Sequence, residues 1–153
     1  YDSMTVRQNL LFPLRRHWSK ERILAEANEA VREALEDVGL SHTLHMMPAE
    51  LSGGMRKRIA LARTIILKPK VILYDEPTTG LDPITSREIS ELILSIQAKY
   101  QTAAIIISHD LSSIKLTANR IIMLIEGRNY AEGTFDQLTE LQDPKVREFF
   151  EGL

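Results

Sequence analysis

Two adjacent acids follow a short apolar run near the middle of the chain. Residues 71–76 read VILYDE, so Asp75 and Glu76 come directly after four apolar residues. In open α/β sheets, ligands bind beyond the carboxyl ends of the strands. An aspartate at that position can hold Mg²⁺, directly or through water, and the next residue, Glu76, can polarise an attacking water. The pattern favours Asp75 as a metal ligand and Glu76 as a general base; a solvated pair of acids is the simpler alternative.

A Ser-Gly-Gly turn precedes a run of helical spacing. Residues 51–55 read LSGGM. The first turn of a helix presents unpaired N–H groups and the positive end of the helix dipole, and the two glycines allow a ligand to approach the backbone closely. Ser52, Gly53 and Gly54 therefore predict a seat for an anion, most naturally a phosphate. A plain serine cap after a glycine hinge explains the same residues equally well.

A histidine and a basic run complete the candidate polar residues. His109 lies in the sequence SHD directly after a second apolar run, where it could contact a phosphate or a water, although a lone histidine is more often structural. His42 and His45 are three residues apart, but nothing nearby completes a metal site. We interpret the basic run at 56–58, which reads RKR, as a solvated helix face rather than a partner site.

These residues need an alternating set of helices and strands to position them. Two continuously apolar runs, at 71–74 and 103–108, predict buried parallel strands. Gly39 and Pro69 end the helices that precede them. The full expectation is helices at 5–14, 19–38, 52–67, 84–99 and 111–118, a hairpin of 120–125 with 129–131, a capping box at Thr134 and Gln137, and a last helix from 143. This order predicts an α/β fold with a parallel sheet behind a helical subdomain, divided at 1–68 and 69–153.

Composition excludes several classes of function. The chain has 153 residues, a net charge of -2 and no cysteine, which suits one domain and excludes disulfides, thiolate nucleophiles and cysteine zinc sites. The near balance of charge gives no broad electrostatic case for binding nucleic acid. No apolar run approaches the roughly 18–20 residues of a membrane-spanning helix. Residues 1–10, which begin with Tyr1, lack the features of a signal peptide, and we expect them to lie inside a longer protein.

The ordered motifs LSGGM, VILYDEPTTGLDP and IIISHD over residues 51–110 resemble the signature motif, Walker B, D-loop and switch histidine of ATP-binding cassette (ABC) ATPases. With the helical subdomain and the hairpin, the resemblance covers nearly the whole chain. It implies a P-loop NTPase (RecA-like) sheet and two cofactors, ATP and Mg²⁺. One departure is Met55, which stands where the family's signature usually has glutamine.

The resemblance also implies a role for each matching residue. Asp75 serves magnesium, Glu76 is the base or positions the water, and His109 senses or clamps the γ-phosphate. The signature residues would contact the γ-phosphate of ATP held by a second subunit; they are Ser52, Gly53 and Gly54. The D-loop would contribute across the same dimer; it consists of Gly80, Leu81 and Asp82.

A narrower resemblance suggests the biological setting. LSGGM, DPIT at 82–85 and DPKVREFFEG at 143–152 are similar to the Mla/Mce-type ATPases that drive lipid movement. That resemblance implies a dimer that couples ATP hydrolysis to transport of a lipid or other organic solute, bound to a permease on the cytoplasmic face of the membrane. A non-transport ATPase acting on RNA or DNA is the alternative, although TTGLD at 78–82 is closer to transporters. A third alternative is a non-catalytic interaction module.

The phosphate loop of this family is not in the sequence. It requires G-x-x-x-x-G-K-[ST], and none of the seven glycines is followed by lysine. We therefore expect these residues to be the C-terminal part of a longer ATPase and to be inactive alone. In the family's sheet, the phosphate-loop strand lies between strands 104–108 and 121–125. We expect these two strands either to close up or to leave a space that a second copy fills.

Overall fold

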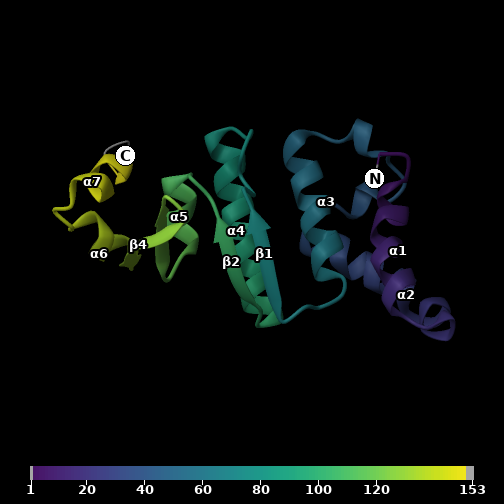
Figure 1. Ribbon diagram of the computed structural model, residues 1–153. Coiled ribbons are helices and arrows are strands. Elements are labelled where there is room, and N and C mark those ends of the chain that lie inside the picture. The colour runs from purple at the N-terminus through teal and green to yellow at the C-terminus, as the bar shows by residue number, and fades with distance from the viewer. Residues whose placement is uncertain (1, 151–153) are drawn as a thin grey trace.

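The computed structural model describes residues 2–150 and shows an α/β fold with a small parallel sheet (Figure 1). The helices are α1 (Val6–His17), α2 (Lys20–Asp37), α3 (Gly53–Ile65), α4 (Pro83–Tyr100), α5 (Leu111–Thr117), α6 (Phe135–Thr139) and α7 (Pro144–Phe150), with 3₁₀ turns at Ser41–Thr43 and Pro48–Glu50. The strands are β1 (Val71–Asp75), β2 (Ala103–Ile107), β3 (Ile121–Ile125) and β4 (Arg128–Gly133). The predicted elements are all present, with ends that differ by up to three residues.

Side-chain caps set where the first three helices begin. The hydroxyls of Thr5, Ser19 and Ser52 each accept a hydrogen bond from the backbone N–H three residues on, which satisfies one otherwise unpaired donor. Helix α1 continues past Pro13 and ends three residues beyond its predicted end. The continuation is favoured because Leu14 lies fully buried after the proline.

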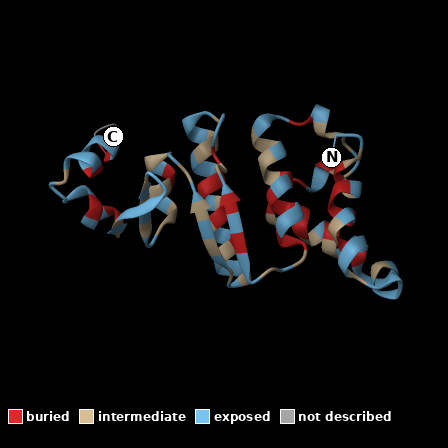
Figure 2. Cartoon of the chain, viewed as in Figure 1, coloured by how far each residue is buried: buried red, intermediate tan, exposed pale blue. Residues whose placement is uncertain are grey.

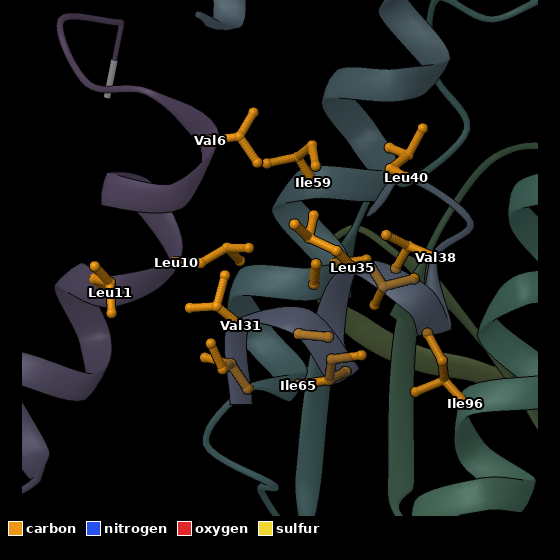
Figure 3. Packing of buried hydrophobic residues seen from close by; sticks show 14 of the residues in the cluster. Val6, Leu10, Leu11, Val31, Leu35, Val38, Leu40, Ile59, Ile65 and Ile96 are labelled. Atoms are coloured by element: carbon orange, nitrogen blue, oxygen red, sulfur yellow. The ribbon is translucent and has the colours of Figure 1, made fainter. Parts of the chain in front are cut away.

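A single hydrophobic core joins the three N-terminal helices to the sheet. Leu10, Val31, Leu35 and Ile65 gather between α1, α2 and α3 (Figure 3). The same cluster continues into β1 and α4 through Ile72, Ile89, Ile93 and Ile96. The division of the chain at residue 68 stays a prediction, and packing is continuous across it.

Strands β1 and β2 form the parallel pair that the sequence predicts, but only one face is covered. The register pairs Leu73 with Ile105 and Asp75 with Ile107. Ile72 and Tyr74 face the core, whereas Val71, Leu73, Ile105 and Ile107 are 54%, 73%, 59% and 60% exposed (Figure 2). The expectation of strands buried on both faces is therefore wrong for the described residues. The apolar pattern is that of a covered sheet, and residues 2–150 cover one side of it only.

Strands β3 and β4 form a separate antiparallel sheet. Within residues 2–150, β2 and β3 do not pair, so the expectation that they close up is wrong; filling of the space by a second copy stays a prediction. Beside this hairpin, Phe135, Leu138, Val146 and Phe150 form a small second core. The end of the motif at 143–152 lies outside the described residues, as do Tyr1 and residue 153.

Candidate functional site

The two acids lie where the sequence places them, at the carboxyl end of β1. Asp75 is the last residue of the strand and is exposed. Glu76 has a φ of 47°, in the left-handed region, while its N–H still donates to Ile107 O at 2.9 Å. The sheet hydrogen bonding therefore extends to Glu76, and the left-handed turn then takes the chain out of the sheet.

Two side chains hold the carboxylate of Glu76. The Nδ1 atom of His109 lies 2.8 Å from Oε1, and the hydroxyl of Thr79 donates to Oε2 at 2.7 Å. The hydrogen bond from His109, followed by that from Thr79, lowers the pKa of Glu76. The same contact with Glu76 raises the pKa of His109. The structure thus brings together Glu76 and His109, which are 33 residues apart in the sequence.

The backbone of Glu76 is held from the N-terminal helices. The ammonium group of Lys57, on α3, donates to Glu76 O at 3.0 Å. The interpretation of the basic run as a solvated face holds for Arg56, which is exposed, but not for Lys57 and Arg58, which are half-buried; all three side chains reach backbone carbonyls. Arg56 donates to Leu51 O, and Arg58 donates to Val38 O and pairs with Glu88. Such contacts leave no signal in the sequence, because they depend on which backbone carbonyls the fold brings within reach of each basic side chain.

The Ser-Gly-Gly turn caps helix α3 through its serine and leaves the N–H groups of its two glycines without an acceptor among the described residues. Ser52 accepts a hydrogen bond from Met55 N at 3.2 Å. Within the described part of the chain, no acceptor is bonded to the N–H groups of Gly53 and Gly54. Ser52 and Gly53 are exposed and Gly54 is half-buried, so the turn is accessible from solvent. This geometry suits an anion seat and does not require one.

Asp82 begins α4. Its carboxylate accepts from the N–H groups of Ile84 and Thr85 and from the hydroxyl of Thr85 at 2.6 Å. These contacts, with the hydroxyl of Thr85 first, lower the pKa of Asp82. Both oxygens are thus engaged in the helix cap, and a contact of Asp82 with nucleotide stays a prediction.

Sequence reasoning missed two residues of this site, Thr79 and Lys57. Thr79 lies only three residues after Glu76, so its contact with that carboxylate is local in the sequence and could have been anticipated. Asp110 is a further unassigned acid; it caps α5 and accepts from Thr78 at 3.1 Å. It serves to join the loops that follow β1 and β2.

Asp75 fits magnesium as a single carboxylate. Among residues 2–150, no group of three or more histidine, aspartate or glutamate side chains could hold a metal ion. Mg²⁺ bound with a nucleotide takes one or two carboxylates, with phosphates and water completing its shell. The exposed carboxylate of Asp75, at the edge of the sheet beside Glu76, suits that arrangement.

Comparison with known proteins decides the family. A family model described as ABC transporter matches residues 1–79, about half of the chain. The chain belongs to the ABC transporter family. It is 36% identical over 152 residues to the probable ribonucleotide transport ATP-binding protein mkl of Mycobacterium leprae, and 35% identical over 153 residues to the intermembrane phospholipid transport system ATP-binding protein MlaF of Escherichia coli K12. These matches cover 99% and 100% of this ABC chain, which spans 43% and 56% of the two relatives.

A solved ABC structure shares the fold. The protein cbiO1 from Clostridium perfringens, described as part of the ABC transporter complex cbiONQ, superposes with a TM-score of 0.80 at 28% identity. The match covers 97% of this chain and 62% of that one. The fold is thus the P-loop NTPase fold of ABC ATPases, as the sequence motifs predict. In the part of the ABC chain that the structure describes, no helix is long and apolar enough to cross a membrane.

Proposed function

We propose that this ABC chain supplies the signature, magnesium and catalytic-base elements of an ATPase that couples ATP hydrolysis to transport. The carrying observation is the Glu76–His109 contact at the end of β1, beside the exposed Asp75. Two acids and a histidine at the carboxyl edge of a parallel sheet suit phosphoryl transfer to water. The relatives' names, which refer to ATP-binding proteins of transport systems, support the same function.

Each residue has a defined task in this proposal. Asp75 would hold Mg²⁺, which neutralises charge on the phosphates. Glu76 orients the attacking water and accepts its proton at the carboxylate. His109 contacts the γ-phosphate; its side chain is 72% exposed, so the ring can turn from Glu76 toward a ligand. The N–H groups of Gly53 and Gly54, with the Ser52 hydroxyl, would bind the γ-phosphate of an ATP molecule held by a second subunit.

The proposal places this chain in a larger assembly. Phosphate positioning supplies much of the catalysis in this chemistry, and the positioning lysine of a phosphate loop is not in these 153 residues. We therefore propose that the 153 residues alone are inactive. The proposed partners are a second ATPase subunit and a transmembrane permease at the cytoplasmic face, contacted through helices α1–α3.

A lipid or related organic solute is the proposed cargo. The motifs at 82–85 and 143–152 support lipid transport, as does similarity to a protein named for phospholipid transport. The name of another relative refers to ribonucleotide transport, so the cargo needs a direct test. Purification with a permease supports the transporter, whereas purification with ribosomes or DNA would favour the nucleic-acid alternative.

Replacing Glu76 tests the chemistry. In the complete natural protein that contains these residues, Glu76→Gln should slow ATP hydrolysis by roughly 10²-fold or more, because a positioned base is lost. ATP binding should persist, since the amide keeps the size of the side chain. Ser52→Arg should instead disturb dimer closure, measured as loss of the ATP-dependent dimer of the Glu76→Gln variant. An unchanged rate in Glu76→Gln would remove Glu76 from its role, and turnover by the 153-residue chain that Glu76→Gln abolishes would refute its proposed inactivity.

A further inference from the structure

One contact at the site has no task in the proposed function. The ammonium of Lys57 lies 3.0 Å from the carbonyl oxygen of Glu76, from a helix that begins with the Ser-Gly-Gly turn. We propose that Lys57 is a positioning residue, which holds the left-handed turn at Glu76 and so aims its carboxylate. This inference rests on the proposed role of Glu76 as the base.

The backbone at Glu76 needs external support. A residue other than glycine in the left-handed region is strained by its Cβ and persists only where the surroundings fix it. On its amino side, the Glu76 N–H is fixed by Ile107 O at 2.9 Å. On its carboxyl side, the carbonyl is fixed by Lys57, with a longer contact of 3.4 Å from Thr79 N. Because both flanking peptide groups are held, the direction of the side chain is set.

The left-handed turn points the Glu76 side chain toward its two hydrogen-bond partners. It brings the carboxylate within hydrogen-bond distance of both His109 and Thr79. If the carbonyl were released, φ and ψ of Glu76 could change together and the residue could leave the left-handed region, where its φ is 47°. The carboxylate would then leave those partners, although the residue itself would be unchanged.

Lys57 is suited to this task because its charge has no acidic partner. Among the described residues, Lys57 forms no ion pair with a carboxylate, whereas its neighbour Arg58 pairs with Glu88. Lys57 is half-buried and lines a cavity of about 220 Å³ between α3, β1 and α4, together with Tyr74 and Asp75. A charged donor in a partly dry setting makes a stronger bond to a carbonyl than a neutral one does. Its positive charge also contributes to the low pKa of Glu76.

The kinetic test uses the complete natural protein with Lys57→Met, Lys57→Arg and a matched control. The control is Lys70→Met, which removes the same charge from an exposed site before the opposite end of β1. We expect Lys57→Met to lower kcat about 10-fold or more, because misplacing a reacting group is costly, with the KM for ATP nearly unchanged. Lys57→Arg, which keeps a charged donor, should recover most of kcat. An unchanged kcat in Lys57→Met, or an equal loss in Lys70→Met, would overturn the inference.

A second measurement does not depend on catalysis. With glycine at position 76 the left-handed turn needs no support, so Lys57→Met should lower the urea midpoint less in a Glu76→Gly background than in the parent. An equal loss in both backgrounds would show that Lys57 does not hold the turn, even if Glu76→Gln confirms the base. If Glu76→Gln leaves hydrolysis unchanged while the urea midpoints behave as expected, the proposed function of Glu76 fails and the contact of Lys57 with the turn stands.

Discussion

Gly53 and Gly54 are adjacent, and the structure predicts opposite responses to alanine. Neither lies in the left-handed region, so alanine is allowed at both positions by the backbone. A Cβ at Gly53 would meet the Leu81 side chain at 3.6 Å, an ordinary contact. A Cβ at Gly54 would meet the methyl of Thr85 at 2.7 Å. That methyl cannot turn away cheaply, because the Thr85 hydroxyl is bonded to Asp82 at 2.6 Å.

The expected sizes follow from two opposing effects. Replacing glycine with alanine in a compatible conformation stabilises by about 0.4–1 kcal/mol, because the unfolded chain loses freedom. Gly53→Ala should show this gain alone. At Gly54, the ends of α3 and α4 must separate by at least about 0.7 Å to restore a contact of 3.4 Å. Overpacking of this kind costs about 1–3 kcal/mol, so Gly54→Ala should be destabilising by roughly 1 kcal/mol net, within a range of about 0–2.6 kcal/mol.

Urea unfolding followed by circular dichroism measures these differences, and a double-mutant cycle identifies their cause. Thr85→Ser keeps the hydroxyl that bonds Asp82 and removes the methyl. In that background Gly54→Ala should become neutral or stabilising, with a coupling energy of about 1–3 kcal/mol. If Gly54→Ala stabilises the parent as much as Gly53→Ala does, or if Thr85→Ser does not rescue it, the close approach of α3 to α4 is refuted.

Two other features give testable expectations. The bare apolar face of the parallel sheet should make the 153-residue chain self-associate, so Leu73→Glu with Ile105→Glu should shift it toward monomer in sedimentation, whereas Leu24→Glu on α2 should not; a monomer at all concentrations would contradict this expectation. His109 should titrate above its ordinary pKa of 6.5 by NMR and move back toward it in Glu76→Gln, because the carboxylate favours the charged ring. The ion pair therefore contributes its full stability between about pH 4.5 and pH 6.5, the ordinary pKa values of the two groups. It loses that stability as the pH rises through the raised pKa of His109 and as it falls through the lowered pKa of Glu76; a titration unaffected by Glu76→Gln would refute the pairing.

The sequence is sufficient to place the candidate catalytic groups, because strand ends are visible in it. An apolar run followed by polar residues marks both the strand and its carboxyl end. In a parallel pair the two carboxyl ends share an edge, so Glu76 and His109 had to be near one another. The cap at Ser52 is equally readable, because it is a local pattern of a few residues.

Whether each face of the parallel sheet is covered, and which distant groups the basic side chains contact, cannot be predicted in the same way. A run such as 71–74 is equally apolar whether its second face is covered by the same chain or left bare, so the exposure of Leu73 leaves no trace in the sequence. The interpretation of the basic run at 56–58 as a solvated face fails for Lys57 and Arg58 for a related reason. Lysine and arginine carry long stems, and whether the charged end meets solvent or a carbonyl depends on elements that are distant in sequence.

Two contacts connect the start of α3 to residues on the sheet side of the molecule. Helix α3 packs with the other N-terminal helices. Its first turn nevertheless lies against α4, because Gly54 leaves no room for a Cβ beside the Thr85 methyl. Lys57 also donates a hydrogen bond to the carbonyl of Glu76, directly after β1. The start of α3 is therefore held against the sheet side of the molecule as well as against α2, whose end Arg58 contacts at Val38 O. A force that displaces this turn reaches Glu76 directly through Lys57, which lies five residues beyond Ser52 on the same helix. The Gly54→Ala and Lys57→Met variants thus test the same mechanical link from its two ends, and both should disturb Glu76 if the link is real.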